Sequence, residues 1–178
     1  VARDFLCFGS PQAIVVVCDA TCLERNLNLV LQTIELSKKT VVCVNLLDEA
    51  KRKGITVDLD ALSKRLGVSV IGTVARKKNS LENLLNTLDE VVKGDCNGDG
   101  FKVRYTPEIE QAISMIEPSL TAKFENKIDC RWLSLRLLED DKEFLSKIFA
   151  YLNFDLLSDE NILKSVNVAR AFLENQGI

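Results

Sequence analysis

The sequence predicts an α/β fold, with a parallel sheet of about three strands and their connecting helices followed by a small all-helical domain. In the first half, apolar runs rich in Val alternate with segments of helical spacing. Strands separated by helices of this length form right-handed crossovers within a parallel sheet. Residues 93–100 contain three glycines and predict a linker, beyond which the pattern is helical. We therefore place one domain at 1–94 and a second at 95–178.

Three apolar segments, at 13–18, 40–44 and 68–74, predict the strands. The first, Ala-Ile-Val-Val-Val-Cys, has no polar alternation, which is typical of a strand covered on both faces. A further short strand-like run lies at 102–105 in the second half.

Helices are predicted wherever apolar residues recur every three or four positions. Asp58 is a suitable N-cap and Gly67 a suitable C-cap for one of them. Pro118 is expected to separate the first two helices of the second domain, because proline lacks a backbone N–H donor. The predicted helices are 23–39, a short one within 45–53, 58–66, 80–92, 107–115, 128–138, 142–152 and 158–176.

Composition excludes several function classes. The chain has no histidine, which removes imidazole as a catalytic base or metal ligand. The net charge of −3 divides into +2 over 1–94 and −5 over 95–178, so neither half has the positive field of a nucleic-acid-binding protein. The six cysteines include no Cys-x-x-Cys pair, and a reduced compartment fits them better than a disulfide framework.

The most informative pattern follows the second predicted strand, where Asn45-Leu46-Leu47-Asp48 resembles the guanine-reading Asn-x-x-Asp element of GTPases. Guanine presents its N1–H and its 2-amino group side by side, and one ionised carboxylate can accept both hydrogen bonds. Adenine lacks this pair of donors. The alternative interpretation is that Asn45 caps a short helix, since Asn and Asp are common at turns and caps.

The third predicted strand ends in Val74-Ala75-Arg76, at the position where GTPases have a Ser-Ala-Lys/Arg-like loop whose backbone binds guanine O6. Two such elements at successive strand ends indicate a guanine-binding site more specifically than either element alone. We therefore predict a guanine-binding site formed by Asn45, Leu46, Asp48, Ala75 and Arg76.

The sequence also resembles the N-terminal cytosolic region of the FeoB family of ferrous iron transporters. The block Asp-Ala-Thr-Cys-Leu-Glu-Arg-Asn-Leu at 19–27 is the most specific match, and Val44–Ala50, Thr73–Arg76 and Arg131-Trp132-Leu133 add to it. The resemblance implies a P-loop-NTPase-like G domain followed by a helical domain, fused to a membrane permease and lying at the cytoplasmic face of the membrane. It further implies GTP or GDP as ligand, Mg²⁺ in the intact domain, and GTP hydrolysis by the parent protein.

Departures from the family pattern limit what this chain can do. It contains no Gly-x-x-x-x-Gly-Lys-Ser/Thr loop, and no switch threonine or Asp-x-x-Gly element precedes its first predicted strand, so it resembles the C-terminal part of the G domain plus the helical domain. We expect it to bind GTP weakly or not at all and to be inactive as an enzyme alone. Val74 also stands where many GTPases have Ser, whereas Ser80 in place of Gly is expected to have little effect.

A second hypothesis is a regulatory or protein-interaction module without nucleotide binding, with the same Asn and Asp serving as caps. Absence of the first strands of the G domain would leave part of the sheet uncovered, which predicts self-association through that surface. Among weaker patterns, 95–100 imitates a calcium loop but lacks its final Glu, Cys18 and Cys22 lie near one strand end, and Arg76-Lys77-Lys78 can attract phosphate. Trp132 is assigned to the helical core.

Overall fold

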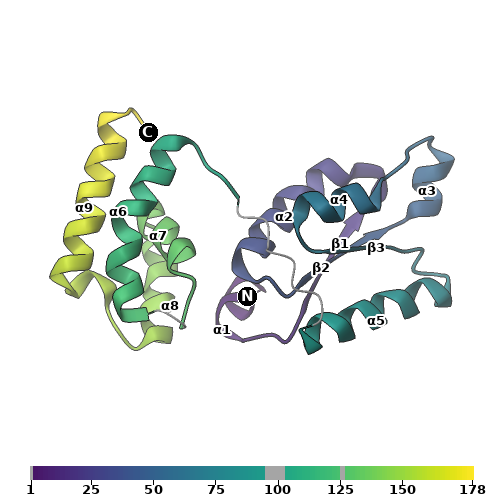
Figure 1. The fold of residues 1–178 in the computed structure, drawn as a ribbon, viewed down its shortest axis with the longest axis horizontal. Helices are drawn as coiled ribbons and strands as arrows, with labels where there is room; N and C mark the ends of the chain where they lie inside the picture. The colour runs from purple at the N-terminus through teal and green to yellow at the C-terminus, as the bar shows by residue number, and fades with distance from the viewer. Residues whose placement is uncertain (1, 95–102, 125–126) are drawn as a thin grey trace. The chain divides into compact units, whose positions relative to one another are not determined.

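The computed structural model describes residues 2–94, 103–124 and 127–178, which form two compact units at 1–103 and 104–178. The first unit contains a three-stranded sheet with helices and the second is helical, as the sequence predicts (Figure 1). Within the described residues, no helix is both long and apolar enough to span a bilayer.

The sheet of the first unit is parallel, with strand order β1-β2-β3. Figure 1 shows α2 and α4 on one side of this sheet and α5 on the other. The register pairs Asp19 with Asn45, so the carboxyl ends of β1 and β2 lie level at one edge. The elements are α1 (Ala2–Phe8), β1 (Ile14–Asp19), η1 (Ala20–Cys22), α2 (Leu23–Leu36), β2 (Thr40–Asn45), α3 (Leu47–Arg52), α4 (Leu59–Leu66), β3 (Ser69–Gly72) and α5 (Lys78–Lys93).

The central strand β2 is buried on both faces. Val42 and Val44 belong to the apolar core under α2 and α4, while Val41 and Cys43 point to the opposite side, over which α5 lies. A strand enclosed in this way reads as a continuous apolar run, which is what the sequence shows.

The prediction that β1 is covered on both faces was wrong. Ile14, Val16 and Cys18 are buried, but Val15 is 37% and Val17 60% exposed. Helix α5 contacts β2 and β3, and the face of β1 on that side is left partly exposed. The apolar run alone could not distinguish an end strand from a central one.

β3 ends at Gly72, two residues earlier than predicted. Thr73 still donates its backbone N–H to the carbonyl of Val44 at 2.8 Å, after which the chain turns away toward α5. Gly72 packs closely against two leucines, since a Cβ there would lie 2.5 Å from Leu47 Cδ1 and 2.6 Å from Leu59 Cδ1, and a larger residue would require both leucine side chains to move. This contact brings α3 and α4 onto the end of β3.

The predicted caps of α4 are confirmed. The Asp58 side chain accepts a hydrogen bond from the Ala61 N–H at 2.9 Å, and Gly67 has the left-handed conformation with φ of 64°. Asp19 likewise accepts from the Thr21 N–H at 2.7 Å and begins η1. Both aspartates therefore have a structural role in their own loops.

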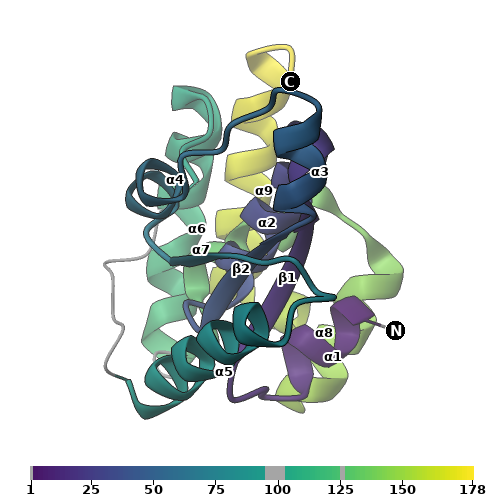
Figure 2. The same ribbon diagram turned by 90° about the vertical axis from the view of Figure 1, so that its right-hand side faces the viewer.

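The second unit packs α6, α7 and α9 against one another, and α6 and α9 run side by side (Figure 2). Trp132 is buried and meets the ring of Phe144 edge-on at 6.0 Å, which confirms its assignment to the core. The elements are α6 (Pro107–Phe124), α7 (Cys130–Glu139), α8 (Lys142–Leu152), η2 (Leu156–Ser158) and α9 (Glu160–Asn175).

Pro118 does not end the first helix of this unit, contrary to the prediction. Helix α6 continues through it to Phe124, and Pro118 itself is exposed. An interior proline costs about 3 kcal/mol. Ile116, Leu120 and Phe124 are buried along one face of the same helix, and each large apolar side chain contributes about 1.5–3 kcal/mol. Burial of this face therefore outweighs the cost of the proline.

A bidentate ion pair joins α6 to α7. Arg131 donates from both terminal nitrogens to the two carboxylate oxygens of Glu110, each at 2.7 Å, and the Tyr105 N–H donates to Oε1 at 2.9 Å. The guanidinium, acting against some desolvation, lowers the pKa of Glu110 from 4.5 to about 2. The pair therefore fixes both the start of α6 and its contact with α7.

We predict that Glu110→Gln removes part of the acid sensitivity of the second unit. Because the folded pKa is depressed, this carboxylate stabilises the fold above pH 4.5, and the contribution is lost as pH falls toward 2. The substitution should reduce the free energy of unfolding at pH 7 by about 1 kcal/mol, a value discounted for solvent screening, and by less at pH 2.5. Urea denaturation at both pH values measures the difference. Glu143→Gln, at an exposed residue paired with Lys147 one turn along α8, is the matched control, and an equal effect of the two variants would contradict the prediction.

Candidate functional site

Asn45 is the last residue of β2 and connects the ends of two strands. Its Oδ1 accepts hydrogen bonds from Thr73 Oγ1 at 3.2 Å and from the Ala75 N–H at 3.1 Å. Its Nδ2 has no hydrogen-bond partner among the described residues and is free to donate. Helix α3 has Leu46 at its N-cap position with no side-chain cap, so the interpretation of Asn45 as a helix cap is wrong.

Leu46 turns the chain from β2 into α3 in the left-handed conformation, with φ of 62° and ψ of 31°. A non-glycine residue in this region is uncommon, and such strain concentrates at functional turns. The turn places Asp48 in the first turn of α3, where the helix dipole favours a negative charge.

Ala75 and Arg76 lie in the turn between β3 and α5. The Ala75 N–H, which the GTPase resemblance assigns to guanine O6, is already donated to Asn45. The Arg76 side chain instead pairs with Asp48, through its Nη2 and the carboxylate Oδ2. The five predicted residues therefore lie in two adjacent loops. Four of them are hydrogen-bonded in pairs, Ala75 with Asn45 and Arg76 with Asp48.

The Asp48 carboxylate is ionised and largely shielded. Its side chain is 22% exposed, and Oδ1 is buried without a hydrogen-bond partner in the described part of the chain. The Arg76 guanidinium lowers the pKa of Asp48 against the opposing effect of desolvation, and the backbone N–H groups of Asp48 and Glu49 lower it further. The carboxylate therefore has one acceptor oxygen that no described residue uses and that is buried in this conformation.

Two residues important for this arrangement were not predicted as part of it. Thr73 is buried and lies 3.2 Å from both Asn45 Oδ1 and Cys43 Sγ. Ser80 Oγ lies 2.8 Å from the Val74 carbonyl and 2.7 Å from that of Lys77, and it accepts from the Val74 N–H at 3.2 Å. Ser80 thus supplies the bracing hydroxyl that Val74 lacks, although we expected it to have little effect. Its place six residues after Val74, at a helix start, was the available signal.

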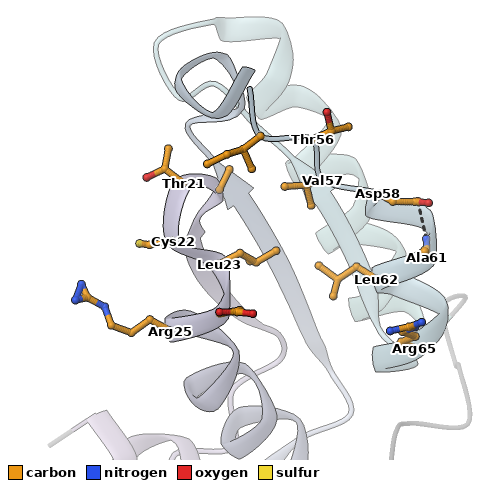
Figure 3. A pocket seen from close by; sticks show the side chains of 13 residues that line it. Thr21, Cys22, Leu23, Arg25, Thr56, Val57, Asp58, Ala61, Leu62 and Arg65 are labelled. Carbon is orange, nitrogen blue, oxygen red and sulfur yellow. Dashed lines mark hydrogen bonds between the residues drawn. The ribbon is translucent and has the colours of Figure 1, made fainter. Parts of the chain in front are cut away.

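A separate groove lies between the start of α2 and the segment leading into α4 (Figure 3). It has a volume of about 760 Å³, and Leu23 faces Val57 and Leu62 across it. Arg25 and Arg65 lie near its two sides at one end. None of the five predicted guanine-site residues lines this groove.

The weaker metal-site patterns find no support. Burial, and then the neighbouring Cys43 and Cys22, raise the pKa of the Cys18 thiol, and a protonated buried thiol is a poor metal ligand. No cluster of three or more His, Cys, Asp or Glu side chains suited to a metal occurs in the residues described. The calcium-loop pattern at 95–100 lies outside them.

Comparison with protein families gives two matches, one for each half of the chain. Residues 1–88 match the model for ferrous iron transport protein B, and residues 105–176 match the FeoB cytosolic helical domain. The chain belongs to the FeoB family. This agrees with the resemblance seen in the block at 19–27 and with the two units of the fold.

Curated FeoB proteins are similar in sequence but much longer. A fusion of Fe(2+) transport protein A with the Fe(2+) transporter FeoB, from Porphyromonas gingivalis, is 34% identical over 75% of this chain, which spans 16% of that protein. The Fe(2+) transporter FeoB of Helicobacter pylori is 28% identical over 98% of this chain, which spans 30% of that protein. The chain thus covers under a third of either relative.

Solved structures of FeoB cytosolic domains share the fold. The apo form from T. maritima superimposes with a TM-score of 0.74 at 29% identity, covering 98% of this chain and 69% of that structure. A GDP form of the same domain gives a TM-score of 0.74 at 28% identity, covering 98% of this chain and 68% of that structure.

We predict that Asn45→Ala loosens the loop between β3 and α5. Loss of the shared acceptor leaves the Ala75 N–H and the Thr73 hydroxyl without it, which should reduce the free energy of unfolding by about 1–2 kcal/mol. Amide hydrogen exchange at Ala75 should become faster. Asn45→Asp retains two acceptor oxygens and is the control. Unchanged Ala75 exchange in the Ala variant would contradict the prediction.

Proposed function

We propose that this chain forms the guanine-recognition end of the GTP-binding domain of a FeoB-like ferrous iron transporter, together with its helical domain. The observation that supports this most directly is the shared oxygen of Asn45, which joins the Asn-x-x-Asp turn to the Val74–Arg76 turn. Similar FeoB cytosolic domains are known in GDP and GMPPNP forms, which supports a guanine nucleotide as the ligand.

In this proposal Asp48 accepts hydrogen bonds from guanine N1–H and the 2-amino group, and Asn45 Nδ2 donates toward the O6/N7 edge. Leu46 and the turn at Ala75 and Arg76 border the base. A site built around paired hydrogen bonds rejects a base that lacks the donors, since its own buried groups would then remain unpaired. Selectivity for guanine over adenine follows from this chemistry.

The residues of this chain do not fit a phosphate or Mg²⁺ site. The sequence contains no Gly-Lys pair followed by Ser or Thr, so the backbone cradle, the lysine and the metal-binding hydroxyl are missing from it. We therefore assign the chain no catalytic residue, and turnover of GTP by these 178 residues alone would contradict the assignment.

The wider context follows from the family. We propose that 1–94 is the C-terminal part of the G domain, that 95–178 is the helical domain, and that both lie on the cytoplasmic side of a membrane beside the permease of the same transporter. There, GTP-dependent ordering of loops would regulate iron import.

The base-reading role predicts a change of nucleotide preference in Asp48→Asn. An amide cannot accept both guanine donors, but it can donate to the 2-oxo group of xanthine. In the intact transporter, GDP affinity should fall at least about tenfold and XDP affinity should rise. Competition binding with fluorescent nucleotides measures both. Asp60→Asn, at an exposed position on α4, is the control, and unchanged guanine preference in Asp48→Asn would exclude this role.

The alternative function, an interaction module without nucleotide binding, is favoured by the uncovered face of β1. Val15 and Val17 lie on an end strand whose outer edge has no partner in the described residues, which makes it suited to pairing with another chain. We propose that isolated copies of this chain self-associate through this surface.

Replacement of Val17 by Lys should reduce that self-association, because charge on an edge strand opposes pairing between chains. Sedimentation velocity should show oligomers for the unmodified chain and a shift toward monomer for the variant. Val168→Lys changes a residue of similar exposure, 52% against 60%, in the second unit and should have no effect. A monomeric unmodified chain would contradict the proposal.

A further inference from the structure

The guanidinium of Arg76 lies where the proposed function requires a base to bind. Its Nη2 contacts Oδ2 of Asp48, the carboxylate assigned to guanine. We propose that Arg76 is an internal competitor of guanine, which occupies Asp48 in the empty site and must be displaced by the nucleotide. This inference rests on the proposed function, and it assigns the Arg76 side chain a role in setting affinity.

The two competing groups share the same chemistry. The N1, C2 and N2 atoms of guanine form part of a cyclic guanidine, and they offer two parallel N–H donors. The arginine side chain offers planar N–H donors in the same fork geometry and is a preferred partner of carboxylates. Lysine, a compact point charge without this fork, resembles guanine much less.

The geometry permits exchange between the two partners. The Arg76 side chain is 70% exposed, so it can leave Asp48 without disturbing packed residues. The backbone of its turn is held by Asn45 on one side and by Ser80 on the other. Displacement therefore requires rotation of one side chain and no rearrangement of the loop.

The Asp48 carboxylate has one oxygen without a hydrogen-bond partner in the described residues. Oδ1 of Asp48 is buried without a partner in the described residues, whereas Oδ2 is occupied by Arg76. A guanine with two donors can satisfy both oxygens, which Arg76 with its single contact does not. The nucleotide consequently gains a hydrogen bond that its competitor lacks.

Competition lowers apparent affinity by the fraction of molecules in which Asp48 is free. For a partly exposed ion pair, we expect the apparent affinity to be lowered by a factor of about 1.5 to 5. Removal of the Arg76 charge should therefore tighten binding by that factor. An arginine that attracted the anionic nucleotide, or stacked on its base, would have the opposite effect when removed, so the sign of the change decides between these roles.

The test uses the 178-residue chain and GMP, which carries the base but needs no polyphosphate cradle. NMR titration with millimolar GMP, and with AMP for specificity, compares the unmodified chain with Arg76→Gln, Arg76→Lys and Asp48→Asn. Lys77→Gln removes the same charge from an exposed neighbour in the same turn and is the matched control. We expect a 1.5- to 5-fold lower Kd for Arg76→Gln, a smaller decrease for Arg76→Lys, and an unchanged or higher Kd for Lys77→Gln.

A second measurement needs no nucleotide. The pKa of Asp48, followed by the ¹³C shift of its carboxylate, should rise in Arg76→Gln, because the guanidinium holds it low. An unchanged pKa would show that the pair does not form in solution and would overturn the inference. Equal or weaker GMP binding by Arg76→Gln, with binding still dependent on Asp48, would also overturn it but leave the proposed function intact. GMP binding by none of the variants would overturn the inference, whereas the proposed function is rejected separately, by unchanged guanine preference of Asp48→Asn in the intact transporter.

Discussion

Burial of β2 on both faces is the constraint on which the loops after β2 and β3 depend. Its apolar residues, Val41 to Val44, are enclosed by helices on either side and hydrogen-bonded to β1 and β3 along both edges. A strand held in this way cannot shift its register without moving its apolar side chains. Asn45, the next residue, is therefore fixed at the carboxyl edge of the sheet, where ligands of parallel α/β folds bind.

The loop after β2 and the turn between β3 and α5 are joined by a small number of hydrogen bonds. One amide oxygen of Asn45 accepts from the β3–α5 turn, and the Ser80 hydroxyl closes the same turn from the other side. Because the turn is otherwise exposed, these polar contacts, and not apolar packing, hold Ala75 and Arg76 beside α3. Small polar changes in this region should consequently affect ligand binding more than the global fold.

Sequence alone predicted what depends on local periodicity. It predicted the strands, the caps at Asp58 and Gly67, the burial of Trp132 and the two loops that meet at Asn45. Sequence alone did not predict the features that depend on contacts between residues distant in the chain. The exposure of Val17 depends on which helix covers which strand, and the passage of α6 through Pro118 on burial against other helices. The Arg76–Asp48 pair joins residues 28 positions apart, and no spacing rule specifies where a flexible arginine lies.

In the proposed site, an arginine at this position has two opposite effects on base recognition. It keeps Asp48 ionised, and it holds the shielded carboxylate in place while the site is empty, which reduces the cost of leaving that charge without a partner. The same contact must be broken before a base can bind. A partly exposed pair is a reasonable compromise, because solvent screening keeps it weak while the carboxylate remains oriented. A fully buried arginine would hold the carboxylate more firmly and exclude the ligand, and a neutral residue would leave Oδ2 without a partner as well as Oδ1.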